Sequence, residues 1–202
     1  PPLTRAWALV RSPPGGWGFC VVGDGWGGKG GARAAEGLGG RVSVVELAPV
    51  RALTAHMDGY RVASLANALL DADVVITATG LIEAIGADSF RHLKHGVVLA
   101  NAGHHDREID VAALAAEADE VIDARDRVKT YVLGDRRVHV LVDGALVNIA
   151  GLDGNPIEIM DLPFSVQAPS RHLLAPGGVP TGLNRAPAGQ PVDPAAGCAP
   201  SA

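Results

Sequence analysis

The chain has 202 residues, of which 48% are hydrophobic and 19% charged, with a formal net charge of −5. This size and apolar content suit one packed domain with tails. The acidic balance, without a Lys/Arg patch, argues against a nucleic-acid partner, and no apolar run suits a membrane span or signal peptide. Two cysteines, Cys20 and Cys198, form no disulfide framework, so we predict a reducing, cytoplasmic setting.

The two ends of the chain differ in composition from its middle. Residues 1–17 contain two Pro-Pro pairs and a Gly-Gly pair, which predicts a poorly ordered lead-in. From Pro169 onward Pro, Gly and Ala dominate, and such a segment buries too little to offset its ordering entropy. We therefore predict one domain over 18–168 and a disordered tail over 169–202. Because residue 1 is Pro rather than Met, we expect a processed chain or a fragment.

Short apolar runs alternate with helix-favouring segments from Phe19 onward. The predicted strands are 19–22, 41–46, 60–63, 73–77, 96–100 and 120–123, and the predicted helices are 28–38, 49–56, 65–70, 87–93 and 110–118. Continuous apolar strands that alternate with helices indicate a parallel sheet covered on both faces. We therefore predict an α/β fold, a doubly wound parallel sheet in three layers, α/β/α.

The pattern changes after Asp126. Three short β runs, 129–133, 138–142 and 145–149, are separated by the turn signals Gly134-Asp135 and Asp143-Gly144. A further helix is predicted over 157–167.

The first strand ends in a glycine-rich turn, Gly23-x-Gly25-x-x-Gly28, which a helix and a second strand follow. Gly23 can take the tight turn, Gly25 lets the backbone approach a pyrophosphate, and Gly28 lets the helix lie close to the strand. The N–H groups at the start of the helix then hold phosphate oxygens. Strand, turn, helix and strand in this order predict a dinucleotide site of the Rossmann type.

An acid, Glu46, ends the second strand, roughly twenty residues beyond the glycines. Its carboxylate would accept hydrogen bonds from the adenosine ribose and repel a 2′-phosphate, so NAD is favoured over NADP. Arg51 follows on the next predicted helix and would suit that phosphate, which makes NADP the second choice.

Five motifs follow one another between Gly23 and Gln167. They are Gly23-Asp-Gly25-Trp-Gly-Gly28-Lys29-Gly30; Glu46, Pro49 and Met57-Asp-Gly59-Tyr60-Arg-Val62; Thr77-Ala-Thr79-Gly80; Asn101-Ala-Gly103-His104-His105-Asp106-Arg-Glu108-Ile109; and Leu146-Val147-Asn148-Ile149 with Gly154-Asn155-Pro156-Ile-Glu-Ile159-Met160. In this order they resemble the NAD-binding domain of S-adenosylhomocysteine hydrolase (adenosylhomocysteinase). Other Rossmann dehydrogenases would share only the first motif.

The resemblance implies an activity in one-carbon (methyl-cycle) metabolism. In the family, NAD oxidises the ribose 3′-hydroxyl of S-adenosylhomocysteine, homocysteine is eliminated, water adds, and the ketone is reduced back to give adenosine. The cofactor carries the redox chemistry, while the protein places the nicotinamide and supplies acid–base groups.

The resemblance also implies cofactor-binding residues. The glycine loop and Glu46 would hold the adenine dinucleotide, Ala102 to His104 would lie at the nicotinamide end, and Asn148 would contact the carboxamide. The full expected set is Gly23, Gly25, Trp26, Gly27, Gly28, Lys29, Gly30, Glu46, Arg51, Thr77, Thr79, Gly80, Ala102, Gly103, His104, Asn148 and Asn155. No metal site and no catalytic residue is predicted in this chain.

Several features depart from the family pattern. In the family a substrate domain with the catalytic residues precedes the NAD domain, and nothing before Phe19 matches it. The family's Lys/Tyr-bearing end segment is replaced by Pro/Gly/Ala sequence. A substrate-contacting His is Asn155 here, an Asn is Arg51, and a polar residue is Leu81. We therefore expect no substrate turnover by the chain alone.

Four residues keep more than one interpretation or receive no role. His104 either contacts the cofactor or is satisfied by backbone groups at a strand end. Trp26 either shields the cofactor or covers the sheet edge, and Lys29 is either bound or solvated. Cys20 has no base beside it in the sequence, so no nucleophilic role is assigned.

Three functional hypotheses follow. The first is the cofactor-binding part of an adenosylhomocysteinase-like enzyme, for which S-adenosylhomocysteine or adenosine is a partner only if a substrate domain is supplied. The second is a stand-alone NAD-binding or regulatory module without catalysis. The third is a small dehydrogenase with His104 as acid–base, which the missing pocket wall disfavours. A homo-oligomer is left open.

Overall fold

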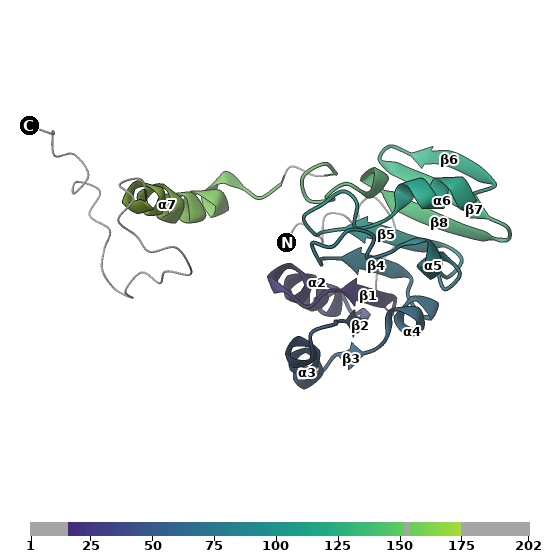
Figure 1. Cartoon of the computed structure of the whole chain (residues 1–202), viewed down its shortest axis with the longest axis horizontal. Helices are drawn as coiled ribbons and strands as arrows, with labels where there is room; N and C mark the ends of the chain where they lie inside the picture. The colour runs from purple at the N-terminus through teal and green to yellow at the C-terminus, as the bar shows by residue number, and fades with distance from the viewer. Residues whose placement is uncertain (1–15, 152–153, 175–202) are drawn as a thin grey trace, which may run out of the picture. The chain divides into compact units, whose positions relative to one another are not determined.

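A computed structural model describes residues 16–151 and 154–174. The chain divides into two compact units, one that ends at Gly154 and one that begins at Asn155. The first contains an eight-stranded sheet with its helices, and the second contains helix α7 (Ile157–Leu174) (Figure 1).

The first unit alternates strands and helices along the chain. The strands are β1 (Gly18–Val22), β2 (Arg41–Val45), β3 (Arg61–Val62), β4 (Val74–Thr77), β5 (Val97–Asn101), β6 (Glu120–Arg125), β7 (Val128–Leu133) and β8 (Arg136–Leu141); the helices are α2 (Trp26–Gly37), α3 (Pro49–Met57), α4 (Leu65–Leu70), α5 (Ala87–Phe90) and α6 (Val111–Glu117), with a 3-10 turn η1 (Val142–Gly144). The strand order is β3-β2-β1-β4-β5-β8-β7-β6. Strands β1 to β5 and β8 pair in parallel, whereas β7 and β6 pair antiparallel. The predicted α/β, doubly wound sheet is confirmed.

The central strand β1 is buried on both faces. Phe19 and Val21 belong to one apolar cluster with Ala32 of α2, while Cys20 and Val22 belong to the other cluster, with residues of α4 to α6. Figure 1 shows the same division, with α2 and α3 on one face of the sheet and α4, α5 and α6 on the other. Burial on both faces explains why β1 is apolar throughout rather than alternating.

The turn between β1 and α2 brings backbone against backbone. Gly23 has a φ of +96°, and a Cβ there would lie 2.7 Å from the carbonyl oxygen of Ala78. A Cβ on Gly28 would overlap the carbonyl oxygen of Gly23. Both glycines therefore have the structural roles that the sequence predicts, a tight turn and a close helix–strand approach.

Two elements differ from the predictions in the second half of the first unit. The predicted strand 145–149 is wrong: its only sheet contact among the described residues is a single bridge between Leu146 and Asn101. Val142 and Asp143, with φ of 54° and 52°, end β8 and turn the chain away. The predicted helix 87–93 ends early at Phe90, where the Arg136 side chain donates to the carbonyl oxygens of Phe90 and Leu93.

The hairpin of β7 and β8, predicted from Gly134-Asp135, is present. The predicted strand 120–123 forms β6, but it pairs antiparallel to β7 at the edge of the sheet rather than continuing the parallel order. Parallel strand β8 takes the place beside β5 instead.

Helix α7 extends beyond its predicted end at residue 167 to Leu174 and includes Pro163 and Pro169. Residues 169–174 of the predicted tail thus belong to α7; the rest of that tail, and lead-in residues 1–15, lie outside the described residues. The chain divides after Gly154, whereas the predicted domain boundary is at 168. Over the described ranges, none of the helices combines the length and apolarity that a bilayer-spanning segment needs.

The close approach at Gly28 predicts a large stability difference between two glycines of α2. Gly28→Ala should lower the free energy of unfolding by about 3 kcal/mol, the upper end of overpacking costs, because the new methyl meets backbone. Gly30→Ala should raise it by about 0.5–1 kcal/mol, because a Cβ there meets nothing within 4 Å and Ala favours the helix. Urea unfolding of both variants measures the difference, and similar values for the two would contradict the packing described.

Candidate functional site

A pocket of about 440 Å³ lies at the carboxyl ends of β1, β2 and β4. Its walls come from the glycine turn, the β2–α3 connection, α4 and the loop after β4: Val22, Gly23, Gly25, Val45, Glu46, Leu47, Ala48, Arg51, Leu65, Ala78, Thr79, Leu81 and Ala84. The strand order reverses between β1 and β4. In open α/β sheets this crevice is where ligands bind.

The start of α2 is open toward this crevice. Gly25 is the N-cap, and no side chain of the described residues caps the helix. A Cβ on Gly25 would meet nothing within 4 Å, and one on Gly27 would touch only Ala78, at 3.9 Å. The N–H groups of the first turn lack intrahelical acceptors and carry the positive end of the helix dipole. This arrangement suits a phosphate group.

Glu46 follows β2, and two backbone groups fix its carboxylate. One oxygen accepts from the Asp24 N–H and the other from the Ala48 N–H, both at 2.8 Å. Burial raises the pKa of Glu46, but N–H groups of Ala48, Asp24 and Leu47 and the charge of Arg51 more than offset it, so the pKa lies below its usual range. Glu46 is therefore ionised at neutral pH and still has lone pairs for ribose hydroxyls.

Asp24 is a buried carboxylate inside the glycine turn, only 1% exposed. Neither of its oxygens accepts a hydrogen bond from the described residues. Lys29 Nζ lies 3.4 Å from one of them and 3.5 Å from the Asp58 carboxylate at the end of α3. Lys29 thus links the turn to α3 through ion pairs, and its contact with the cofactor stays a prediction.

Arg51 and Trp26 lie on the rim of the crevice. Arg51 lines the pocket beside Glu46 and also a second pocket of about 500 Å³, which contains Trp26, Lys29 and Arg33. Trp26 is 96% exposed, so it covers no part of the sheet edge. Gly30 lies on the exposed side of α2, away from the backbone contacts that Gly28 makes.

Asn101, at the end of β5, joins the neighbouring loops through its buried side chain. Its amide oxygen accepts from the Gly103 N–H at 2.8 Å and from the Thr77 hydroxyl at 3.3 Å. Its amide nitrogen donates to the carbonyls of His105 and Gly144, at 2.6 and 2.8 Å. Thr77 is fully buried, so its hydroxyl serves this network.

Glu108 forms a second hub, on the loop after β5, and is completely buried. Its carboxylate accepts four hydrogen bonds: from the Thr79 N–H (3.0 Å) and hydroxyl (2.9 Å), the Gly80 N–H (2.8 Å) and the His104 N–H (3.0 Å). Burial raises the pKa of Glu108, but these hydrogen bonds outweigh it, so the pKa lies below its usual range. A Cβ on Gly103 would overlap this carboxylate, which explains the glycine there.

Asn148 lies beside these loops. The Val147 N–H donates to the Asn101 carbonyl at 2.9 Å, which places the following residue next to the end of β5. The side-chain oxygen of Asn148 is buried and accepts no hydrogen bond from the described residues. A buried amide oxygen without a donor is costly, so a ligand N–H at this point would complete its environment.

The backbone and the side chain of His104 have different surroundings, and its contact with the cofactor stays a prediction. Its backbone N–H is held by Glu108, while its side chain is exposed and touches His105 edge to face, with ring centroids 4.7 Å apart. Ala102 donates its N–H to the Thr77 carbonyl at 2.8 Å. The segment 102–104 therefore stands at the carboxyl edge of the sheet with one exposed imidazole.

The structure brings most of the expected residues to this edge. The hydroxyls of Thr77 and Thr79 are engaged by Asn101 and Glu108 rather than pointing to a ligand. Asn155 is the first residue of the second compact unit, which is described by itself, so its place at the cofactor site stays a prediction. Among residues 16–151 and 154–174, no cluster of three His, Cys, Asp or Glu side chains could hold a metal ion.

Asn101 and Glu108 organise the loops of the site but are absent from the expected residues, although both stand within one of the five motifs. The sequence offers a chemical signal for both residues. Asn101 is a polar residue that directly continues an apolar strand, and Glu108 is an acid near turns that contain glycine, whose backbone N–H groups need acceptors.

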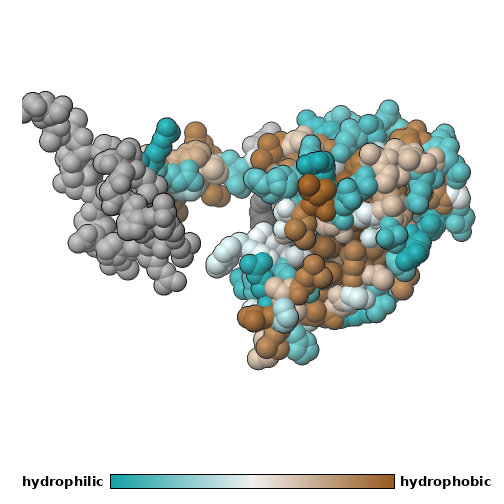
Figure 2. Space-filling model, viewed as in Figure 1, coloured by the Kyte–Doolittle hydropathy of each residue, from teal (hydrophilic) through white to brown (hydrophobic). Residues whose placement is uncertain are grey.

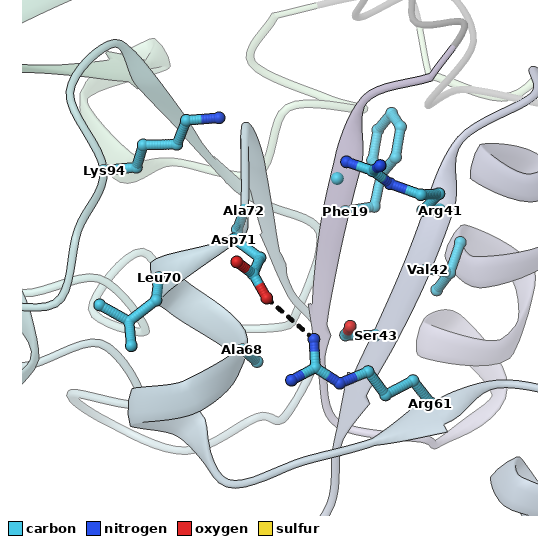
Figure 3. A pocket seen from close by; sticks show the side chains of 11 residues that line it. Phe19, Arg41, Val42, Ser43, Arg61, Ala68, Leu70, Asp71, Ala72 and Lys94 are labelled. Carbon is cyan, nitrogen blue, oxygen red and sulfur yellow. Dashed lines mark hydrogen bonds and ion pairs between the residues drawn. The ribbon is translucent and has the colours of Figure 1, made fainter.

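A further pocket, of about 480 Å³, lies at the opposite, amino end of the strands, around Gly18 and Arg41. Figure 3 shows the Arg61 guanidinium directed at the Asp71 carboxylate across it, 3.0 Å away. Lys94 pairs with Asp73, which also accepts from the Gly18 N–H. Asp71 and Asp73 are thus engaged by the side chains of Arg61 and Lys94 and by a backbone N–H group. We therefore interpret these contacts as structural, because this end has no counterpart of the uncapped helix start at the carboxyl edge.

Apolar side chains also gather on the outer face of α3, as Figure 2 shows at the lower edge of the first unit. Val50, Leu53 and Met57 are spaced along one side of the helix and are 78%, 62% and 78% exposed. Spacings of three and four residues place them in one strip.

The residues at the crevice fit a dinucleotide. Gly25 leaves room for a pyrophosphate, Glu46 presents an ionised carboxylate to a ribose, and the Asn148 oxygen requires a donor such as a carboxamide. The fold and the site thus define an NAD-binding Rossmann domain. A solved structure of dipicolinate synthase, A chain, from Bacillus subtilis shares the fold, with a TM-score of 0.50 and 15% identity over 55% of this chain and 40% of that one.

The family follows from sequence comparison. The sequence model described as "S-adenosyl-L-homocysteine hydrolase, NAD binding domain" matches residues 14–154, and the chain belongs to this family. S-inosyl-L-homocysteine hydrolase of Methanosarcina mazei is 42% identical over 83% of this chain and 41% of its own length. Adenosylhomocysteinase of Thermococcus kodakarensis is 47% identical over 76% of this chain and 37% of its own length. The chain thus spans about two fifths of these relatives, and the predicted family and cofactor, NAD, are confirmed.

The ion pair between buried Asp24 and Lys29 predicts that substitutions at these two residues have non-additive effects on the free energy of unfolding. Lys29→Ala should lower the free energy of unfolding by about 1–3 kcal/mol, because it removes the cation nearest to a buried carboxylate. The double variant Asp24→Asn, Lys29→Ala should recover at least half of that loss. Arg61→Ala, which breaks an exposed pair, should cost about 0–1 kcal/mol. Urea unfolding measures these free energies. A double variant that is no more stable than Lys29→Ala would contradict the burial of Asp24.

The lowered pKa of Glu108 predicts the pH dependence of its contribution to stability. A carboxyl whose pKa is lower in the folded state stabilises the fold fully above its unfolded pKa, about 4.3, and loses that effect as the pH falls through the folded value. The stability difference between wild type and Glu108→Gln should therefore be constant from pH 7 to 5.5 and shrink below pH about 4. Thermal unfolding across this range measures it, and a difference that grows toward acid would be inconsistent with this sign.

Proposed function

We propose that the chain is the cofactor-binding domain of an enzyme that hydrolyses a nucleosyl-homocysteine thioether, of the S-adenosyl or S-inosyl type. The observation that carries this is the coincidence of the family match with a crevice whose uncapped helix start, Glu46 carboxylate and unpartnered Asn148 oxygen suit a dinucleotide. Relatives of both names match the chain at similar identity, so the base of the substrate stays open between adenine and hypoxanthine.

The expected residues take specific roles under this proposal. The N–H groups of Trp26 to Gly28 hold the pyrophosphate, and Glu46 accepts the hydroxyls of the adenosine ribose. Gly103 and His104 line the nicotinamide end, with the Asn148 oxygen as acceptor for the carboxamide. The positions after β1, β2 and β5 support this order, because dinucleotides extend across the switch point.

NAD, when bound, would supply reversible oxidation at the ribose of the substrate. The residues of this chain orient the cofactor, and the acid–base groups that act on substrate are expected in a substrate domain. Asn155, expected from the resemblance at the cofactor site, stays a prediction, since the second unit is described by itself.

A homo-oligomer and a cytoplasmic location stay predictions of the same proposal. The apolar strip of α3, Val50, Leu53 and Met57, offers surface that an oligomer could bury. Sedimentation equilibrium of the chain with and without NAD would measure its association.

The direct test is titration of the chain with NAD by calorimetry, followed by an assay for homocysteine release from S-adenosyl- and S-inosylhomocysteine. We expect saturable NAD binding and no hydrolysis by the chain alone. NAD binding that persists when a substrate domain is supplied, still without hydrolysis, would favour a regulatory module. Oxidation of a small alcohol with NAD would favour a dehydrogenase that uses His104. Absence of NAD binding would defeat the regulatory module and the dehydrogenase, and would leave a degenerate copy of the family's domain.

The carboxylate of Glu46 should set the choice between NAD and NADP. Glu46→Gln should weaken NAD binding about tenfold, because charged hydrogen bonds to the ribose are replaced by neutral ones, and should narrow the preference for NAD over NADP. Glu117→Gln, an exposed acid on α6, is the matched control and should leave both affinities unchanged. An unchanged preference in Glu46→Gln would place the ribose elsewhere.

A further inference from the structure

The loops after β4 and β5 lie next to each other but lack sheet pairing where a ligand would meet them. The β4–β5 ladder ends at the pair Thr77 and Asn101, and one backbone bond follows directly, from Ala102 to Thr77. Farther along, the Glu83 N–H donates to the Arg107 carbonyl and a bridge pairs Ile85 with Ile109. Between these two places, at Thr79–Gly80 and Gly103–His104, no backbone bond among the described residues joins the two loops.

Glu108 supplies this connection with its two carboxylate oxygens. Oε2 accepts the N–H and the hydroxyl of Thr79, so it holds the β4 loop. Oε1 accepts one N–H from each loop, from Gly80 at 2.8 Å and from His104 at 3.0 Å. At this place a single atom therefore joins the two loops, through charge-assisted bonds that are stronger than neutral ones.

The Glu108 carboxylate lies directly against Gly103, which is one of the residues expected at the nicotinamide end. A methyl group on Gly103 would overlap Glu108, so the backbone of residues 102–104 passes directly over the carboxylate. The backbone of Glu108 is itself held, by its N–H to the His105 carbonyl and by the Ile85 N–H to its own carbonyl. Glu108 is thus held by hydrogen bonds at its backbone, and its carboxylate in turn holds both loops.

We propose that Glu108 is a positioning residue for the nicotinamide half of NAD. It fixes the Gly103–His104 backbone relative to Thr79 and Gly80, and hence relative to the adenosine pocket, of which Thr79 forms part. This inference rests on the proposed function, because it presumes that NAD occupies the crevice. Loss of the carboxylate leaves the phosphate and ribose contacts in place and loosens the loop under the nicotinamide.

The pair of ligands NAD and ADP-ribose separates this role from general stability. ADP-ribose contains everything in NAD except the nicotinamide ring, so effects on the adenosine pocket or on the folded fraction change both affinities equally. Only a change at the nicotinamide end alters their ratio. Calorimetric titration of the 202-residue chain with each ligand gives that ratio for the wild type and for each variant.

Glu108→Gln keeps the shape of the side chain but places an amide N–H₂ against N–H donors. We expect the ratio of NAD affinity to ADP-ribose affinity to fall about tenfold, equivalent to about 1.4 kcal/mol. Thr79→Val, which deletes one of the four hydrogen bonds and keeps the carboxylate, should lower the ratio about twofold in the same direction. Glu117→Gln is the charge-matched exposed control and should leave the ratio unchanged.

The outcomes are distinguishable. A wild-type chain that binds neither ligand defeats the proposed function itself. A wild type that binds ADP-ribose as tightly as NAD overturns the inference, because the nicotinamide then makes no contact to position. A folded Glu108→Gln chain with an unchanged ratio also overturns it. If circular dichroism shows that variant unfolded, an unchanged ratio in Thr79→Val overturns it instead.

Discussion

Backbone N–H groups that leave the end of a buried parallel strand need acceptors, and in this domain two side chains meet that need. Asn101 and Glu108 accept from the turns after β4 and β5 and are both fully buried. Unpaired N–H groups at this depth would each cost free energy comparable to a lost hydrogen bond. The shape of the carboxyl edge, and with it the crevice, depends on these two polar hubs.

The crevice combines the hydrogen-bonded side chains of Asn101 and Glu108 with the uncapped start of helix α2. α2 has no side-chain cap among the described residues, while Glu46 is held by two backbone bonds and Lys29 links Asp24 to Asp58. Positive partial charge therefore stands at the expected phosphate position and negative charge at the expected ribose position. The two halves are preorganised by different means, a helix dipole on one side and a fixed carboxylate on the other.

Local chemistry made much of this fold predictable. Some requirements act within a few residues and are therefore predictable. They include the tight turn at Gly23, the close helix–strand approach at Gly28, and the end of β2 next to Glu46. The path of residues 145–149 was not predictable, because their apolar alternation suits a strand while Val142 and Asp143 at positive φ redirect the chain. The place of β8 beside β5 also escaped prediction, since strand order depends on pairing between distant segments.

The place of β8 has a consequence for how the domain forms. Val97 of β5 pairs with Val138 of β8, so β5 keeps one open edge until the β7–β8 hairpin has been made. During synthesis, an apolar central strand is therefore exposed while the intervening segment with α6 and β6 emerges. Parallel pairings between distant segments form slowly, and exposed strand edges invite intermolecular pairing. Pairing of β8 with β5 closes this open edge, and we therefore expect it to shorten the exposure of an apolar strand.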